Sequence, residues 1–336
     1  MSFENLKLEK GMYASGRSFT GVLESLDPSE NYKGTALEGL DAYQRQLKRF
    51  DIRVSGVGSS PVEKFFSTSD SAALFPEYVS RAVKQGMEEA DKLPDIVATT
   101  TVIDGLDYRS IASVPTEDEK ELKTVAEGAY IPETRVNTQE NLVKLNKRGR
   151  MLVASYEAIR FQKLDLFTIT LKQIGAYIAR SLFSDAVSVL INGDGNNNAA
   201  SSSNIADTST HVLAYSDLVD FWNLFSPYEL NTMIADPTST AKMLNLTEFK
   251  DPRAGLDFHG TGKMITPIGA NLIKSSYVPS GKLIGIDKSC ALEMVKSGDV
   301  VTEYDKLIDR QLERAAVTLT AGFAKIFGSA SRILNI

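Results

Sequence analysis

Residues 165–195 read DLFTITLKQIGAYIARSLFSDAVSVLINGDG. Apolar residues recur at steps of three or four from Phe167 to Val189, a spacing that keeps them on one face of an α-helix. Asp165 can cap the start of this helix, and the glycines of the closing NGDG sequence can end it. About 27 residues at ~1.5 Å per residue predict a rod of roughly 40 Å. No other segment combines this length and regularity, so the stretch organises the fold.

This segment has one simpler interpretation. Taken alone, it could be a long core helix of an ordinary α/β domain. It is too charged for a membrane span, because Asp165, Lys172, Arg180 and Asp185 interrupt it.

The composition is that of a soluble globular protein. Of 336 residues, 43% are apolar and 24% are charged. The net charge of −6 argues against extensive coating of nucleic acid, although the protein could still face a packaged polyanion. The N-terminus has no apolar signal core. The single cysteine, Cys290, excludes an intramolecular disulfide framework and predicts a reducing cytoplasm.

The first third of the chain is predicted to contain an N-terminal arm, two helices and a β-rich stretch. Residues 1–35 lack periodicity and are expected to form an arm with little core of its own. Helical spacing follows in 36–54, and another helix is expected to begin at Phe75-Pro76. Residues 96–111 are rich in β-branched side chains around Asp104-Gly105, which predicts a hairpin turn.

Residues 114–159 are long, strongly charged and only weakly alternating. The apolar pairs Val143/Leu145 and Met151/Val153 predict an extended two-stranded hairpin with little apolar face. Because such a hairpin has no core to lie on, we expect it to lie against a neighbouring subunit or to stay mobile.

The second half alternates strands and helices. Residues 196–210 are expected to form a polar loop, and 215–227 a helix capped by Ser216. Residues 231–246 predict a strand that runs through Asp236-Pro237 into a helix. Short strands are expected within 263–295 and after 298, so the fold class is α+β.

Motifs that would indicate a ligand site are incomplete. The phosphate-loop-like GTGK at 260–263 has Asp257 and Met264 where a glycine and a hydroxyl residue are required. The GVGSSP at 56–61 lacks the third glycine of a dinucleotide site. Asp194, Asn196 and Asn198 resemble the start of a calcium loop, but its sixth and twelfth positions are alanine and isoleucine.

Residues that could perform catalysis are equally sparse. His211 and His259 have no metal-ligand spacing, and no serine lies in a nucleophile elbow. Cys290 has an apolar context typical of an inert, packed thiol. We therefore predict no catalytic residue, no metal site and no cofactor, so the protein is not expected to be an enzyme. The basic residues Lys144, Lys147, Arg148 and Arg150 could be a solvated edge, a contact for an acidic patch of a neighbouring subunit, or a nucleic-acid contact.

Four short motifs in the right order resemble those of tailed-phage major capsid proteins with the Hong Kong 97-like fold. They are VAEGAYIPE at 125–133, LINGDG at 190–195, MIADPTSTAKMLNL at 233–246 and VPSGKLIGID at 278–287. In that family the first begins a long β-hairpin, the E-loop. The second ends the spine helix of the peripheral (P) domain, and the last two belong to the axial (A) domain. The resemblance covers roughly residues 65–336.

The resemblance implies a domain organisation. Residues 1–66 would be an N-terminal arm, 67–117 the first part of the P-domain, 118–152 the E-loop and 153–192 the P-domain spine helix. Residues 193–297 would form the A-domain and 298–318 the returning P-domain strands. The terminal strands, 319–336, would rejoin the A-domain.

The resemblance also implies a function. The protein would be the major capsid protein of a tailed phage or prophage, forming pentamers and hexamers of an icosahedral shell around double-stranded DNA. Assembly would take place in the bacterial host cytoplasm, with a separate scaffolding protein and a portal, without sequence-specific DNA binding and without a membrane. The alternative is an encapsulin-like compartment that stores an enzyme cargo.

Some family members join their subunits through an E-loop lysine, but the corresponding position here is Ile131. We therefore expect no isopeptide bond by that route, which a boiled denaturing gel can check. We also expect the arm to remain uncleaved. Inter-subunit contacts are predicted for Glu133, Arg135, Lys147, Arg148 and Arg150, and reversing the charges of the last three should impair assembly but not folding.

Overall fold

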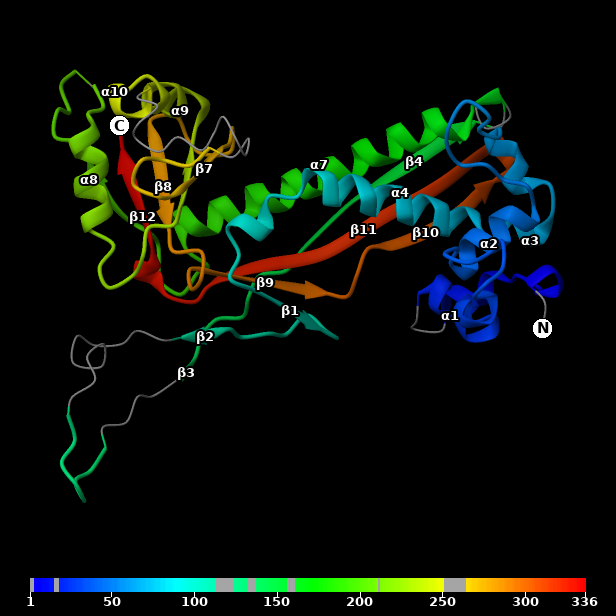
Figure 1. Cartoon of the computed structure of the whole chain (residues 1–336), viewed down its shortest axis with the longest axis horizontal. Coiled ribbons are helices and arrows are strands. Elements are labelled where there is room, and N and C mark those ends of the chain that lie inside the picture. The colour runs from blue at the N-terminus through cyan, green and yellow to red at the C-terminus, as the bar shows by residue number, and fades with distance from the viewer. Residues whose placement is uncertain are drawn as a thin grey trace. The chain divides into compact units, whose positions relative to one another are not determined.

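The computed structural model describes residues 3–14, 18–112, 124–131, 137–155, 157, 161–210, 212–250 and 264–336. Its helices and strands form two compact units, and the expected α+β class is confirmed. Helix α7 (Leu164–Asn192) and strand β11 (Leu312–Lys325), both labelled in Figure 1, contribute residues to both units. Unit 1 comprises Met1–Asp91, Lys147–Arg180 and Asp299–Leu319; unit 2 comprises Lys92–Asn146, Ser181–Gly298 and Thr320–Ile336.

In unit 1, α7 packs closely against helix α4 (Phe75–Ala90). A Cβ atom added at Gly86 would lie 2.1 Å from the carbonyl oxygen of Lys172, and one added at Gly175 would lie 2.1 Å from that of Val83. Both distances are shorter than any normal contact, so only glycine allows the two backbones to approach this closely. As predicted, α4 begins at Phe75-Pro76.

The long helix agrees with the prediction except at its first residue. Asp165 lies inside the first turn rather than at the cap, and its Oδ1 accepts a hydrogen bond from the Gly56 backbone N–H at 3.3 Å. The helix ends before Gly193, whose φ of 79° suits glycine. The length and hydropathy of α7 would also fit a membrane span, but 56% of its most apolar window is buried in the fold, as in the core helix of a soluble protein.

Three strand segments of unit 1 pair with one another. Strand β10 (Val301–Leu307) is antiparallel to β11, and β4 (Asn146–Ser155) also pairs with β11. Met151 and Val153, at one end of the segment expected to form the hairpin, therefore do not pair within that segment, because the partner of β4 comes from the C-terminal part of the chain. Sequence alternation indicates that a segment is a strand but does not identify its partner.

The N-terminal region has a core of its own, contrary to the expectation for residues 1–35. Helices α1 (Phe19–Leu26) and α2 (Ala42–Arg49) lie in unit 1, and Leu6, Leu8, Phe19 and Leu23 are buried. The remaining short helices are α3 (Ser69–Ala72) and the 3₁₀ turns η1 (Phe3–Asn5), η2 (Lys10–Ala14), η3 (Ser29–Tyr32), η4 (Val62–Phe66), η5 (Leu93–Asp95), η6 (Ile308–Arg310) and η7 (Gly328–Ala330).

A fully buried arginine holds this region together. The Arg45 Nε donates to Asp27 Oδ2 at 2.9 Å, and its Nη1 donates to the carbonyl oxygen of Leu40 at 2.7 Å. The ring of Tyr32 lies 4.4 Å from the guanidinium carbon. Hydrogen bonds and a cation–π contact of Arg45 provide much of this packing. The sequence did not indicate a core here because such contacts leave no periodic apolar pattern.

Unit 2 contains a five-stranded sheet. Its order is β5 (Ser201–Asn204), β12 (Ser331–Asn335), β8 (Lys282–Ile286), β6 (Thr232–Ala235) and β7 (Asn271–Lys274). Side chains of helices α8 (Tyr215–Asn223) and α9 (Pro237–Leu244) join its core, and α10 (Thr247–Lys250) follows. Gly285 of β8 leaves space for Phe221 and Phe225, because a Cβ there would lie within 2.8 Å of both rings.

Several local predictions for unit 2 can be checked. The strand before Asp236-Pro237 and the helix after it are confirmed, with the Asp236 side chain capping α9. The cap of α8 is Ala214, not Ser216. The expected polar loop at 196–210 contains β5, whose backbone pairs with β12 while most of its side chains stay exposed.

Unit 2 contains a second group of strands, which includes the strands on either side of the charged residues 113–136. Strand β1 (Thr99–Ile103) is parallel to β9 (Leu292–Ser297), which is antiparallel to the end of β11. Strand β2 (Ile111–Ala112) pairs with β3 (Asn137–Thr138). The expected hairpin at Asp104-Gly105 is therefore wrong, because β1 and β2 take different partners.

Candidate assembly surfaces

The structure places three of the five predicted contact residues on one strand. Lys147 and Arg150 of β4 are exposed, and Arg148 is half-buried. Glu133 and Arg135 lie outside the described residues. Because β4 pairs with β11, the basic residues belong to a sheet of unit 1 and not to a free hairpin.

Strand geometry divides these three cations between two faces. Successive side chains of a strand point to opposite sides, so Arg148 and Arg150 share one face and Lys147 lies on the other. The guanidinium of Arg150 lies 6.0 Å from the ring centroid of Tyr177, so the face with Arg148 and Arg150 is the one beside α7. The basic cluster in the sequence is therefore not a single patch.

Two residues of α7 complete the group on that face. Arg180 lies 5.7 Å from the same Tyr177 ring, which is 48% exposed and has an arginine near it from each of the two elements. Sequence analysis missed Tyr177 and Arg180. The signal was available, because both lie on the stripe of the helix that its apolar spacing leaves uncovered. We call Arg150, Tyr177 and Arg180 the arginine–tyrosine patch.

The segment 104–146 is attached to the rest of unit 2 through two buried polar groups, which we call the loop root. The first is centred on Glu293, which is 5% exposed. Its carboxylate accepts hydrogen bonds from Thr101 Oγ1 at 2.5 Å, Tyr108 Oη at 2.8 Å and Ser110 Oγ. Burial and the adjacent carboxylate raise the pKa of Tyr108, which therefore remains a hydrogen-bond donor.

The second polar group of the loop root is centred on Asp194, just after α7. Its Oδ2 accepts from the Lys325 backbone N–H at 2.8 Å and from Gln139 Nε2 at 3.1 Å. Gln139 is 4% exposed and also donates to the carbonyl oxygen of Lys325 at 2.9 Å. Asp194 and Asn196, which resemble calcium ligands in sequence, instead accept hydrogen bonds from protein N–H groups.

Lys325 is the most unusual residue of the loop root. Its side chain is 1% exposed, and its Nζ has no hydrogen-bond partner among the described residues. Burial lowers the pKa of this amine to about 8, and the negative charge of Asp194 opposes that effect. Sequence analysis gave no sign of this residue, because its backbone partners, Asp194 and Gln139, are remote in sequence.

The described outer part of the same segment is exposed. All residues of 124–131 are exposed, with Tyr130 at 78% and Ile131 at 72%. We call this part the loop tip. An aromatic and an aliphatic side chain that are this exposed next to each other are typical of a contact surface.

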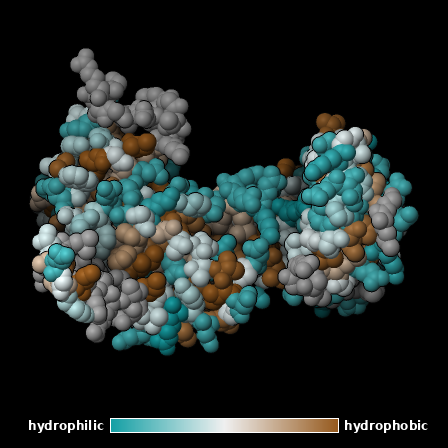
Figure 2. Space-filling model, turned by 60° about the horizontal axis from the view of Figure 1, so that its bottom comes forward, coloured by the Kyte–Doolittle hydropathy of each residue, from teal (hydrophilic) through white to brown (hydrophobic). Residues whose placement is uncertain are grey.

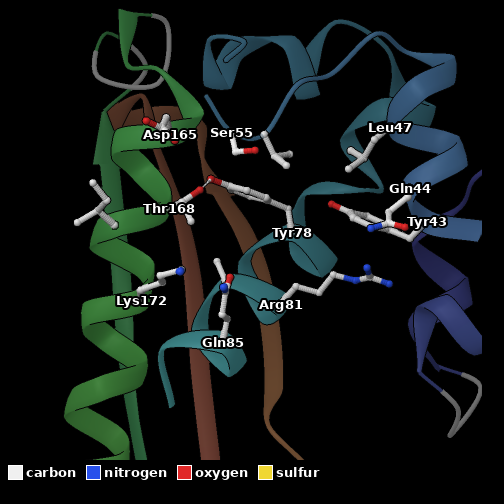
Figure 3. Close-up of a pocket in the computed structure, with 13 residues that line it drawn as sticks. Tyr43, Gln44, Leu47, Ser55, Tyr78, Arg81, Gln85, Asp165, Thr168 and Lys172 are labelled. Atoms are coloured by element: carbon white, nitrogen blue, oxygen red, sulfur yellow. Dashed lines mark hydrogen bonds between the residues drawn. The ribbon is translucent and has the colours of Figure 1, made fainter. Parts of the chain in front are cut away.

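Unit 1 also contains a cleft of about 640 Å³ between α2, α4 and α7 (Figure 3). Its floor includes the apolar parts of Tyr43 and Tyr78, and the Tyr78 hydroxyl points toward Thr168, with the oxygens 2.7 Å apart. At its edges, Arg81 pairs with Asp41 at 2.8 Å and Lys172 pairs with Glu89 at 2.7 Å. Because Arg81 and Lys172 already have carboxylate partners, the cleft is suited to receiving an apolar side chain and not to catalysis.

Exposed apolar residues lie near one end of this cleft. Ile169, which lines the cleft, is 55% exposed and Leu166 is 56% exposed. Val57 is 99% exposed in a loop whose Gly56 bonds to Asp165. On the face of the molecule in Figure 2, apolar residues form separate patches among hydrophilic ones. Such patches fit contacts with other protein surfaces.

The described residues contain little that could perform catalysis. They include no group of three or more His, Cys, Asp or Glu side chains able to hold a metal ion. Burial and the nearby Asp287 raise the pKa of the Cys290 thiol to about 11, which makes a reactive thiolate scarce at neutral pH. The phosphate-loop-like residues 260–263 lie outside the described residues, as do His211 and His259. The described chain resumes at Met264.

Comparisons with known proteins agree with this architecture. A family model described as phage capsid protein matches residues 138–323, more than half of the chain. No curated protein matches the chain.

Solved structures share the fold at low sequence identity. A virus-like particle from Pyrococcus furiosus is 14% identical, with a TM-score of 0.52 over 77% of this chain and 98% of that chain. The capsid of a native GTA particle is 11% identical, with a TM-score of 0.54 over 73% and 90%. The capsid of cyanophage P-SCSP1u is 13% identical, with a TM-score of 0.50 over 73% and 88%.

The family match covers β4, α7 and most of unit 2, and the structural likeness extends over about three quarters of the chain. The resemblance found in the sequence is thereby confirmed, as is its Hong Kong 97-like fold. The chain belongs to the phage capsid protein family and is a major capsid protein, a structural subunit that assembles with copies of itself into the capsid of a virion.

Proposed function

We propose that this protein forms pentamers and hexamers of an icosahedral shell that encloses double-stranded DNA. The observation that supports this most is the contrast within segment 104–146, where a buried polar root supports an exposed tip. A closed shell repeats a heterologous contact around each ring, in which one surface of a subunit meets a different surface of the next. Many modest contacts of this kind then add up through multivalency.

In this proposal the segment acts as an E-loop that crosses to the next subunit. The resemblance assigns residues 118–152 to it, and Glu133, Arg135, Lys147, Arg148 and Arg150 remain proposed inter-subunit contacts. Because β4 pairs with β11 in unit 1, the last three would make their contacts from the body of the subunit and not from the crossing loop. The P-domain would consist of 67–117, 153–192 and 298–318, and the A-domain of 193–297 joined by 319–336. Residues 1–66 would be the N-terminal arm, although its packing in unit 1 makes a folded headpiece a better description.

Other components would complete the particle. We propose assembly in the host cytoplasm around a separate scaffolding protein, with a portal at one vertex and no sequence-specific DNA contact. Its role would be structural, without an enzymatic activity. We also propose that no isopeptide bond forms at position 131, since isoleucine has no amine.

The test is electron microscopy of the full chain expressed alone and purified by size exclusion. Closed shells or capsomer rings are expected, and the shell diameter would give the lattice. A clean monomer that also fails to form shells with a scaffolding protein would contradict the proposal.

A cargo-storing compartment on the same fold is the second candidate. The match to the virus-like particle from Pyrococcus furiosus is a likeness of fold alone, whereas the family model is that of phage capsid proteins. Small uniform shells that contain a co-purifying enzyme would favour the compartment.

A further inference from the structure

The arginine–tyrosine patch presents two cations in a fixed arrangement. Arg150 and Arg180 come from β4 and α7, and their guanidinium carbons lie 6.0 Å and 5.7 Å from the centroid of the Tyr177 ring. Contact with an aromatic face restrains long side chains that would otherwise be flexible. The patch therefore has the features of an anion-binding surface: two exposed guanidinium groups beside one partly exposed aromatic ring.

Neither cation is neutralised by a described part of the chain. Among the described residues, no carboxylate forms an ion pair with Arg150 or Arg180, whereas Arg45, Arg81 and Lys172 all have such partners. Both arginines lie near the same ring in a protein whose net charge is −6. Charge complementarity calls for an anionic partner from outside the subunit.

The same chain carries a surface of the opposite sign. Segment 104–146 contains nine acidic and five basic residues, a net charge of −4. Four of those acids lie in the described part, are exposed and form no ion pair with a described residue: Asp104, Asp107, Glu127 and Glu140. The segment thus presents carboxylates, and the arginine–tyrosine patch presents the groups that bind them.

We propose that the arginine–tyrosine patch of one subunit binds carboxylates of segment 104–146 of a second copy. This rests on the proposed shell function and reverses the charge roles expected from sequence, in which the basic residues were placed on the loop. The acidic segment and the basic body are different surfaces of the same chain, so their contact is heterologous and can propagate around a ring. Packaged nucleic acid is the rival partner for the same guanidinium groups.

The test uses charge reversal with a matched control elsewhere in unit 1. Arg150→Glu combined with Arg180→Glu should lower the fraction of full-length protein in particles at least tenfold, measured by gradient sedimentation and electron microscopy. Lys33→Glu combined with Lys48→Glu makes the same change of charge at two exposed lysines of unit 1 that carry no proposed contact, and should change the yield less than twofold. Thermal unfolding of the unassembled variants checks that they fold.

A compensating variant identifies the partner. Replacing Asp104, Asp107, Glu127 and Glu140 with lysine in the R150E/R180E chain should restore particles, because each copy then carries both reversed surfaces. Carbodiimide treatment of R150K particles should also join position 150 to a carboxylate of the segment on another subunit, which peptide mass spectrometry detects.

The outcomes distinguish failure of the proposed shell function from failure of the proposed patch contact. If the wild-type chain forms no particles even with a scaffolding protein, the proposed shell function fails, and this inference fails with it. If the wild type assembles and R150E/R180E assembles equally well, only this inference fails. Normal R150E/R180E shells with a reduced nucleic-acid content would overturn it in favour of the nucleic-acid contact.

Discussion

The root and the tip of segment 104–146 differ in what holds them. At the root, Glu293 and Gln139 are about 5% and 4% exposed and make hydrogen bonds to several other residues. At the tip, Tyr130 and Ile131 are 78% and 72% exposed. The root therefore contributes to the stability of the single subunit, while the tip offers its surface to another molecule. Substitutions at the two places should separate these roles.

Removing the carboxylate at the root should have the largest effect. Glu293→Ala leaves Thr101, Tyr108 and Ser110 without their shared acceptor in a buried site, and we expect a loss of about 3–4 kcal/mol in the free energy of unfolding. Urea denaturation of the unassembled subunit measures it. Glu127→Ala at the tip is the control and should change stability by less than about 0.5 kcal/mol. Equal effects at the two positions would remove the distinction between root and tip.

The second polar group should be the next most sensitive. Asp194→Ala removes the acceptor of the Lys325 backbone N–H and of Gln139, and should cost about 2–3 kcal/mol. Hydrogen exchange should rise at Gln139–Val143, because this side of the segment loses its attachment. Unchanged exchange there would mean that Asp194 does not hold the segment.

The buried amine of Lys325 should destabilise the root at neutral pH. Its pKa of about 8 in the folded protein lies below the ordinary value of 10.5, so the folded state disfavours the proton that the unfolded chain binds. The penalty is complete below about pH 8 and disappears as the pH rises toward 10.5. Lys325→Met should therefore raise stability at pH 7 by roughly 2 kcal/mol. Denaturation at pH 7 and pH 10 should show the advantage shrinking; a constant difference would exclude this protonation effect.

Sequence patterns predicted features that depend on local periodicity. The helix from Leu164 to Asn192, the proline-started α4 and the strand before Asp236-Pro237 all depend on spacing and capping within one segment. The family followed from short motifs in order. Strand partners were a different matter, since β1 pairs with β9 and β4 with β11 across long stretches of chain.

The surfaces were harder to predict than the elements. Lys147 and Arg150 were found as a basic cluster, but only the pairing of β4 separates their faces and brings Arg150 to Tyr177. Asp194 and Asn196 were recognised as polar residues with a calcium-like spacing, yet their partners, Lys325 and Gln139, are remote in sequence. A site built from distant segments leaves no local spacing to recognise.

At the tip, the expected effect on the subunit is the smallest. Ile131→Ser removes an apolar side chain that is 72% exposed, so the free energy of unfolding should change by less than about 0.5 kcal/mol. If the tip contacts another subunit, the same change should still reduce particle formation, because an apolar group buried only on assembly contributes only there. Matched urea curves and gradient sedimentation of wild type and variant measure the two effects. A large loss of subunit stability would mean that Ile131 packs within its own chain. The tip would then contribute to the stability of the single subunit as the root does, and the distinction between them would be wrong.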